Sequence, residues 1–187
     1  MLLWMIETRI WSFGPPKILW SGLKPWKCSV GLLMAHQILP KDFKEFLKLL
    51  TEHKVNYLLI GGYAVGFYGY PRTTGDMDVY ICNSHQNARK MVAVFKEFGF
   101  SDAEIVPSIF QEKGKIIRIG VPPIRIEILT DIDGVTFDEC YRQRLDVVID
   151  DVPVTMISLE HLRQNKRASG RYKDLDDLEN LPEKWLN

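Results

Sequence analysis

The stretch from Leu58 to Cys82 constrains the fold of this chain more than any other. It begins inside a short apolar run, Val55 to Ile60, whose length and β-branched ends predict a buried strand. Gly61 and Gly62 interrupt that run, and a helix-like segment follows from Tyr63 to Tyr68. Backbone amides at the start of such a helix can bind a phosphate group. A glycine pair after a strand is more often only a turn.

Two aspartates precede the second apolar run of this stretch, Val79 to Cys82. Asp76 and Asp78 are two residues apart. Because side chains along a strand alternate, we expect both carboxylates on the same face of the sheet. Two carboxylates this close repel each other, and a hard divalent cation such as Mg²⁺, which prefers oxygen ligands, would relieve the repulsion. The competing interpretation is a solvated strand edge or a helix cap.

The glycine pair, the aspartate pair and the polar residues between them together resemble a known family. The pattern is similar to that of the nucleotidyltransferase superfamily typified by DNA polymerase β, and in particular to a small bacterial branch that includes abortive-infection type toxins. Members carry Gly-Gly or Gly-Ser, a spacer, and then Arg-x-Ser/Thr-x-Asp-x-Asp. The matching residues here are Gly61, Gly62, Arg72, Thr73, Thr74, Asp76 and Asp78.

A third carboxylate lies on a later predicted strand. The run from Ile124 to Leu129 alternates strictly, with isoleucines on one face and Glu127 on the other. By itself, Glu127 is only an outward-facing carboxylate on a strand. The superfamily has its third carboxylate, more often an aspartate, on a strand of this kind, so the resemblance assigns that role to Glu127.

The charged stretch at residues 165–178 has two interpretations. The simpler one is a solvated turn between two helices. The stretch is also similar to the C-terminal signature of the toxin-like branch, Lys…Arg-x-Lys-Asp-x-x-Asp, with matches at Lys166, Arg171, Lys173, Asp174 and Asp177. Cations before a helix N-terminus suit a triphosphate. The two aspartates, one helical turn apart, suit either dipole capping or a catalytic role.

The resemblance implies transfer of a nucleoside monophosphate from a nucleoside triphosphate, such as ATP, to an acceptor hydroxyl, with release of pyrophosphate. It implies a pair of Mg²⁺ or Mn²⁺ ions held by Asp76, Asp78 and Glu127, which are also the expected catalytic residues. Arg72 is expected either to bind phosphate or to support Asp76. The residues expected to contact the nucleotide are Gly61, Gly62, Arg72, Thr74, Lys166, Arg171, Lys173 and Asp174.

The acceptor stays open among an RNA 3′ end, a protein hydroxyl and a small molecule, and a toxin-like role would add an antitoxin partner. Two other classes of function also remain open. One is a non-catalytic antitoxin or regulatory module that keeps the fold, although the intact set of three carboxylates argues against it. The other is an interaction protein whose N-terminal segment is the active part.

Composition indicates a globular protein without a dominant charge. The 187 residues fit one domain, and 46% of them are hydrophobic. Lysines and arginines number 24, as do aspartates and glutamates, so no global basic field points to nucleic acid. Three widely spaced cysteines fit reduced thiols in the cytoplasm. No apolar run is long enough to span a membrane, so we expect no membrane partner.

Residues 1–35 differ in composition from residues 36–187, which we expect to form the nucleotidyltransferase-like domain. Prolines in the first segment prevent a long helix. We expect this segment to be disordered or to precede the true start of translation, for which Met34 is a candidate. The segment holds four of the five tryptophans, Trp4, Trp11, Trp20 and Trp26.

The expected fold class is α/β (α+β), a short mixed sheet flanked by helices on its faces, with the site at one sheet edge. Asp42 is expected to cap a first helix, with Glu45 completing a capping box. Ser84 and Ser158 are expected to cap two later helices. The remaining expected elements are a weak strand at 105–110, a strand at 115–121, a helix at 137–144, and a hairpin of strands 146–150 and 152–157.

Overall fold

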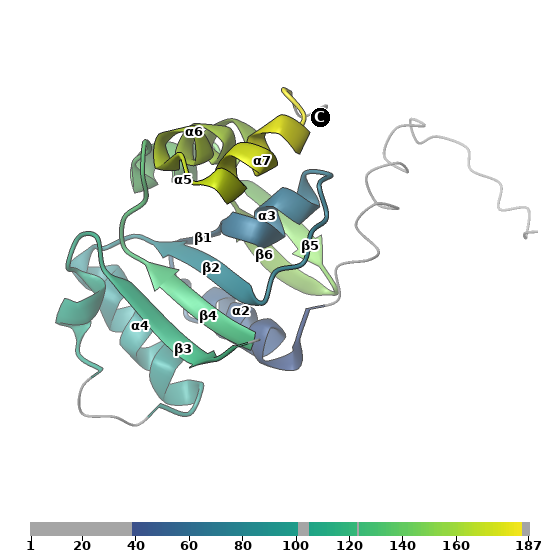
Figure 1. Ribbon diagram of the computed structural model, residues 1–187. Helices are drawn as coiled ribbons and strands as arrows, with labels where there is room; N and C mark the ends of the chain where they lie inside the picture. Colours follow the sequence, from purple (N-terminus) through teal and green to yellow (C-terminus); the bar gives the residue numbers. More distant parts are fainter. Residues whose placement is uncertain (1–38, 101–104, 123, 185–187) are drawn as a thin grey trace, which may run out of the picture.

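The computed structural model describes residues 39–100, 105–122 and 124–184. Figure 1 shows their arrangement as a sheet between two layers of helices. The elements in chain order are α2 (Lys41–Glu52), β1 (Tyr57–Leu59), α3 (Gly61–Phe67), β2 (Asp76–Ile81), α4 (His85–Glu97), the 3₁₀ helix η1 (Pro107–Phe110), β3 (Ile116–Val121), β4 (Ile124–Leu129), α5 (Phe137–Arg142), β5 (Leu145–Ile149), β6 (Val152–Met156), α6 (Leu159–Ser169) and α7 (Tyr172–Asn180).

The strands form one mixed sheet in the order β3-β4-β2-β1-β6-β5. Two neighbouring pairs, β2 with β4 and β1 with β6, are parallel, and the other three pairs are antiparallel. The expected α/β class is therefore confirmed. The expected position of the site at a sheet edge is wrong, because β2 and β4, which carry the three carboxylates, are interior strands.

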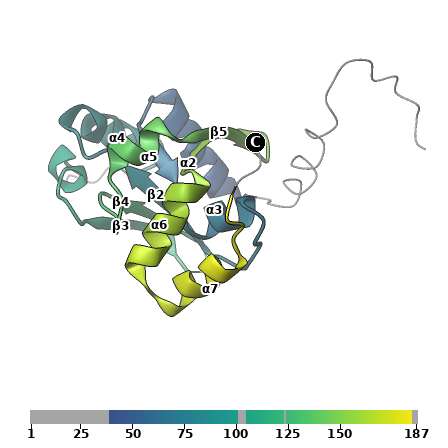
Figure 2. The same ribbon diagram turned by 90° about the horizontal axis from the view of Figure 1, so that it is seen from above.

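Helices cover both faces of the sheet. Figures 1 and 2 show α2 and α4 on one face, and α3, α5, α6 and α7 on the other. On β2 the side chains alternate, so that Met77 and Val79 are fully buried while Asp76 and Asp78 point to the opposite face. Further along that second face, Tyr80 contacts Phe137 of α5 edge to face, with ring centroids 5.1 Å apart. The face that carries the aspartates is therefore the one covered by α3 and the C-terminal helices.

The predicted helix starts are partly confirmed. The Ser84 and Ser158 side chains accept hydrogen bonds from the backbone N–H groups three residues on, as expected of N-caps. The predicted capping role of Asp42 is wrong, because the helix begins earlier, after Pro40, whose carbonyl accepts from Lys44 N–H at 3.1 Å. Asp42 lies in the first turn instead, where a negative charge favours the helix dipole.

The predicted strands are confirmed with one exception. The hairpin of β5 and β6 turns at Asp150 and Asp151, which have φ angles of 50° and 64°. The weak strand predicted at 105–110 is wrong, since the structure has the 3₁₀ helix η1 there. Its first residue, Pro107, has no N–H to donate to a sheet, and its last, Phe110, is buried against Phe95 of α4.

Some sequence features lie outside the described residues. The tryptophan-rich segment 1–35, including Met34, is among them. Within the parts of the chain that the structure describes, no helix is both long enough and apolar enough to cross a membrane.

Candidate functional site

The three predicted carboxylates lie side by side on two parallel strands. In the pairing of β2 with β4, Asp78 is opposite Glu127 and Asp76 is opposite Arg125. Because each of these residues is separated from the next on its strand by one residue, all four side chains lie on the same face of the sheet. The alternation visible in the sequence predicted the shared face of Asp76 and Asp78. Only the pairing of the strands brings Glu127 beside them.

The glycine pair lets the start of α3 approach this cluster closely. Gly61 has a φ angle of +64°, which favours glycine, and a Cβ atom at this position would overlap the Asp78 carboxylate. A Cβ atom on Gly62 would lie 2.7 Å from Thr74 Oγ1. The backbone N–H of Gly62 also acts as a hydrogen-bond donor toward Asp78. Both glycines are therefore needed to pack the helix start against the aspartate strand.

Two arginines that the sequence analysis did not single out bind the carboxylates. Arg125 Nη2 is 2.9 Å from Asp76 Oδ2 and 2.8 Å from Glu127 Oε1. Arg118 Nε, on the edge strand β3, donates to the same Glu127 oxygen at 2.9 Å. The alternation of β4 contained the signal, because Arg125 is two residues before Glu127 and must share its face. Arg118 is opposite Glu127 only through the pairing of β3 with β4.

These ion pairs set the present positions of the carboxylates. With Arg125 between Asp76 and Glu127, no three His, Cys, Asp or Glu side chains of the described residues are close enough together to hold a metal ion. Arg125 Nε is buried and has no hydrogen-bond partner there. The guanidinium group of Arg125 is therefore the cation already bound to Asp76 and Glu127.

No arginine or lysine of the described residues forms an ion pair with Asp78, and its environment disfavours its charge. Burial and the negative charges of Glu127 and Asp76 raise the pKa of Asp78 to about 6, against the opposing effects of Lys166 and the Gly62 amide. A carboxyl group with this pKa is partly protonated at neutral pH or just below it. The site would therefore gain stability from an additional positive charge next to Asp78.

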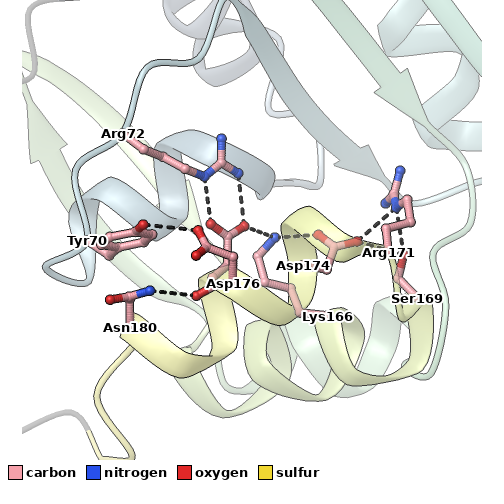
Figure 3. A network of polar contacts seen from close by, with 9 residues as sticks. Tyr70, Arg72, Lys166, Ser169, Arg171, Asp174, Asp176 and Asn180 are labelled. Atoms are coloured by element: carbon pink, nitrogen blue, oxygen red, sulfur yellow. Dashed lines mark hydrogen bonds and ion pairs between the residues drawn. The ribbon is translucent and has the colours of Figure 1, made fainter.

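The charged C-terminal stretch forms a buried ion-pair network rather than a solvated turn. Lys166 Nζ on α6 is 2.8 Å from Asp174 Oδ1 and 2.6 Å from Asp177 Oδ2, both on α7. Arg72, in the loop before β2, donates to both oxygens of Asp177 at 2.6 and 2.9 Å. Figure 3 shows these contacts where α6, α7 and that loop meet. The network ties α7 to the loop that leads into the aspartate strand.

This network changes the expected role of two residues. The Lys166 side chain is 5% exposed and has two carboxylate partners, so its ammonium group is not free to hold a triphosphate. One of the two roles expected of Arg72 was to support Asp76. The structure does not show this role, because the Arg72 guanidinium group binds Asp177 while Arg125 binds Asp76. In both cases the sequence indicated charge in the right place but could not show which opposite charge would be nearest.

The carboxylates of α7 remain ionised in this network. Burial raises the pKa of Asp174, but hydrogen bonds from Lys166, Ser169 and Arg171 outweigh it, so that the pKa lies below its ordinary value. Burial also acts on Asp177, and the hydrogen bonds from Arg72 and Lys166 again leave its pKa lowered. The negative charges that hold Arg72 and Lys166 are therefore present at neutral pH.

A cleft of about 720 Å³ is lined by residues of β2, β4, α6 and the starts of α3 and α7. Acidic residues of β2 and β4 line one side of it, and Arg171 and Lys173 at the start of α7 line another. Among the described residues, Lys173 is a cleft-lining cation without an ion-pair partner. Every residue predicted from the sequence to be catalytic, metal-binding or nucleotide-binding lines this cleft: Gly61, Gly62, Arg72, Thr74, Asp76, Asp78, Glu127, Lys166, Arg171, Lys173 and Asp174.

The raised pKa of Asp78 predicts a pH-dependent stability. In the folded protein Asp78 keeps its proton up to about pH 6, whereas the unfolded chain releases it near the ordinary aspartate pKa of about 4. Between these values the folded state binds more protons, so Asp78 lowers the stability as pH rises, by up to about 3 kcal/mol above pH 6. Without divalent metal, Asp78→Asn should therefore raise the free energy of unfolding by about 1–3 kcal/mol at pH 8 and by little at pH 4.

Denaturant unfolding in the presence of a chelator measures this difference. Asp133→Asn, which changes an exposed carboxylate of the same cleft, is the matched control and should have no such effect. Equal stability of Asp78→Asn and the wild type at pH 8 would show that Asp78 is not an uncompensated buried charge.

The network around Asp177 predicts a large loss of stability. Asp177→Asn leaves Arg72 and Lys166 buried without their shared counter-charge, so it should lower the free energy of unfolding by about 3–5 kcal/mol. Asp176→Asn is the matched control, because Asp176 is the neighbouring, exposed residue, whose carboxylate accepts from Tyr70 Oη and has no ion-pair partner among the described residues. A similar small effect of both substitutions, measured by denaturant unfolding, would mean that the network contributes no more than a surface ion pair.

Comparisons with known proteins indicate the family and the fold of this chain. The sequence profile of a family described as nucleotidyl transferase of unknown function (DUF2204) matches residues 40–187. A crystal structure from Thermotoga maritima, whose protein has a provisional assignment as a nucleotidyltransferase, shares the fold with a TM-score of 0.52. The two chains are 20% identical, over 77% of this chain and 94% of the other. No curated protein matches the sequence. Because the profile covers most of the chain, this protein belongs to that family of nucleotidyl transferases.

Proposed function

We propose that this protein transfers a nucleoside monophosphate from a nucleoside triphosphate to an acceptor hydroxyl, with release of pyrophosphate. The observation that supports this most is the cluster of Asp76, Asp78 and Glu127 on one sheet face, next to the glycine pair at the start of α3. Family membership and the shared fold support the reaction class. The cleft with an acidic side and a basic side suits a metal-bound triphosphate.

We propose that Asp76, Asp78 and Glu127 hold a pair of Mg²⁺ or Mn²⁺ ions. The residues fit such ions, because carboxylate oxygens are the ligands that hard cations prefer. The raised pKa of Asp78 and the bridging of Asp76 and Glu127 by Arg125 both indicate that the three carboxylates need positive charge. Bound there, the ions would stabilise the charge on the attacking and leaving oxygens. Arg125 must release its two carboxylates before they can bind metal.

Other residues of the cleft take separate roles in this proposal. Lys173 and Arg171 bind the triphosphate, since Lys173 has no partner in the described structure and the Arg171 side chain is 77% exposed. The amides of Gly61 and Gly62 face the phosphates at the start of α3. Glu127 accepts the proton of the acceptor hydroxyl. Lys166 and Arg72 act at a distance, by holding α7 in position through Asp177.

One observation favours a second candidate, a non-catalytic binding module of the antitoxin or regulatory kind. Arg125 and Arg118 neutralise Glu127, and Arg125 also neutralises Asp76, so this part of the site is stable without metal. A module of this kind would bind a nucleotide without turnover. For the enzyme, the acceptor remains an RNA 3′ end, a protein hydroxyl or a small molecule, and a toxin with an antitoxin partner is one physiological setting.

A transfer assay tests the catalytic proposal. The protein, Mg²⁺, each labelled triphosphate in turn and a total cell extract should together label one fraction of the extract, which identifies the acceptor class. Asp76→Asn should reduce the labelling at least about a hundredfold, because the loss of a metal ligand removes charge stabilisation of the transition state. Asp138→Asn, an exposed carboxylate on α5, is the matched control. Undiminished labelling by Asp76→Asn would contradict the proposed role of the carboxylates.

A melting experiment tests binding separately from turnover. Mg²⁺ and a triphosphate together should stabilise the protein by more than the sum of their separate effects, because the metal links the carboxylates to the phosphates. Saturation to about 100 times the dissociation constant corresponds to roughly 2.7 kcal/mol. Lys173→Ala should reduce this shift, and Lys184→Ala, which changes an exposed lysine outside the cleft, should not. Strictly additive shifts would show that metal and nucleotide do not share a site, and synergy without transfer would support the binding module.

A further inference from the structure

A second, smaller pocket lies between α5 and α6, apart from the cleft described above. Its volume is about 340 Å³, and it is lined by Glu139, Arg142, Gln143, His161 and Gln164. None of these residues lines the larger cleft. The lining is polar throughout, and nothing in the proposed nucleotidyl transfer uses it.

His161 forms the buried part of this pocket. The residue is 8% exposed, and its Nδ1 atom is 2.9 Å from Ser158 Oγ. The same hydroxyl oxygen accepts from the His161 backbone N–H at 3.3 Å, which fixes the ring at the start of α6. The other ring nitrogen, Nε2, has no partner among the described residues. Since the ring lines the pocket, Nε2 is available to a ligand there.

The remaining donors come from the C-terminal end of α5. Arg142 uses its Nε atom to donate to the Asp138 carbonyl at 3.0 Å, and its two Nη atoms have no partner in the described structure. The Gln143 side chain is likewise unpartnered there. Gln164 instead donates its amide to the Gly134 carbonyl at 2.8 Å. The pocket therefore presents a guanidinium group and a carboxamide with free donors, and an imidazole whose Nε2 carries a hydrogen when Nδ1 accepts from the Ser158 hydroxyl.

Glu139 is the one carboxylate in the pocket lining, and it already accepts hydrogen bonds from the start of its own helix, α5. Its Oε2 atom accepts from Thr136 N–H at 3.2 Å and from Thr136 Oγ1 at 2.7 Å, which completes the capping box of α5. Hydrogen bonding by the Thr136 side chain lowers the pKa of Glu139, with smaller contributions from Arg142 and His161. Glu139 is thus a fixed negative charge at the rim that opposes an anion without filling the pocket.

We propose that this pocket is a second binding site, which takes a small oxyanion, namely a phosphate or carboxylate group. A planar guanidinium group beside an imidazole N–H is a common arrangement for oxyanion recognition. The start of α6 adds the positive end of a helix dipole on the same side. The site does not depend on the proposed transfer reaction. Asn165 and Gln164 of α6 donate to the carbonyls of Asp133 and Gly134, so the pocket shares a helix and a loop with the larger cleft.

Nuclear magnetic resonance of the histidine side chains tests this proposal on the full chain. The protein has four histidines, so the loss of one signal in His161→Gln assigns His161. Titration with inorganic phosphate, and separately with acetate, should shift the His161 signal with saturation and leave unchanged that of the exposed His85, which does not line the pocket. The two titrations distinguish a phosphate from a carboxylate ligand. Repetition in Lys173→Ala, which weakens phosphate binding in the larger cleft, should leave the His161 shift unchanged.

Two further variants test whether oxyanion binding depends on the charged side chains of the pocket. Arg142→Ala, on the protein surface, should weaken oxyanion binding at least about tenfold, because it removes a charged donor. Glu139→Gln should strengthen it severalfold, because glutamine keeps the capping box but removes the opposing charge. An unshifted His161 signal with both anions, unchanged affinity in Arg142→Ala or weaker binding in Glu139→Gln would each overturn the proposal.

Discussion

The burial of Asp78 next to two other carboxylates is the constraint on which the rest of the site depends. The parallel pairing of β2 with β4 places Asp78 opposite Glu127, and the glycine pair covers it closely enough that a side chain at Gly61 would overlap it. A charge in this position is costly unless cations surround it. Lys166 offsets part of this cost, and the proposed metal ions would offset more of it, whereas the neighbouring arginines bind Asp76 and Glu127.

The positive charges divide into two groups with different tasks. Arg125 and Arg118 bind the carboxylates of Asp76 and Glu127 directly and are half-exposed in the cleft, so ligands can compete with them. Lys166 and Arg72 are buried against Asp177, which has no exposed surface, and so they act as structural supports. Arg125 and Arg118 therefore compete with other cations for the carboxylates. Lys166 and Arg72 hold α7, and with it Lys173, in position.

The network also explains why helices far apart in the sequence form one site. Arg72 belongs to the loop between α3 and β2, whereas Lys166 and Asp177 belong to the last two helices. Their ion pairs join α7 to this loop beside the cleft, which Arg72 and Lys166 both line. Lys173 and Arg171 line the same cleft, and the Arg171 side chain remains exposed.

The sequence by itself determined the local features: strand and helix periods, the two serine caps, and the shared face of Asp76 and Asp78. These follow from interactions between residues that are near in the chain. It did not determine the partners of Arg72 and Lys166, the presence of Arg118 and Arg125 in the site, or the interior position of β2 and β4. Those depend on strand order and helix docking, because a charged side chain pairs with the opposite charge nearest in space, whatever its distance along the chain.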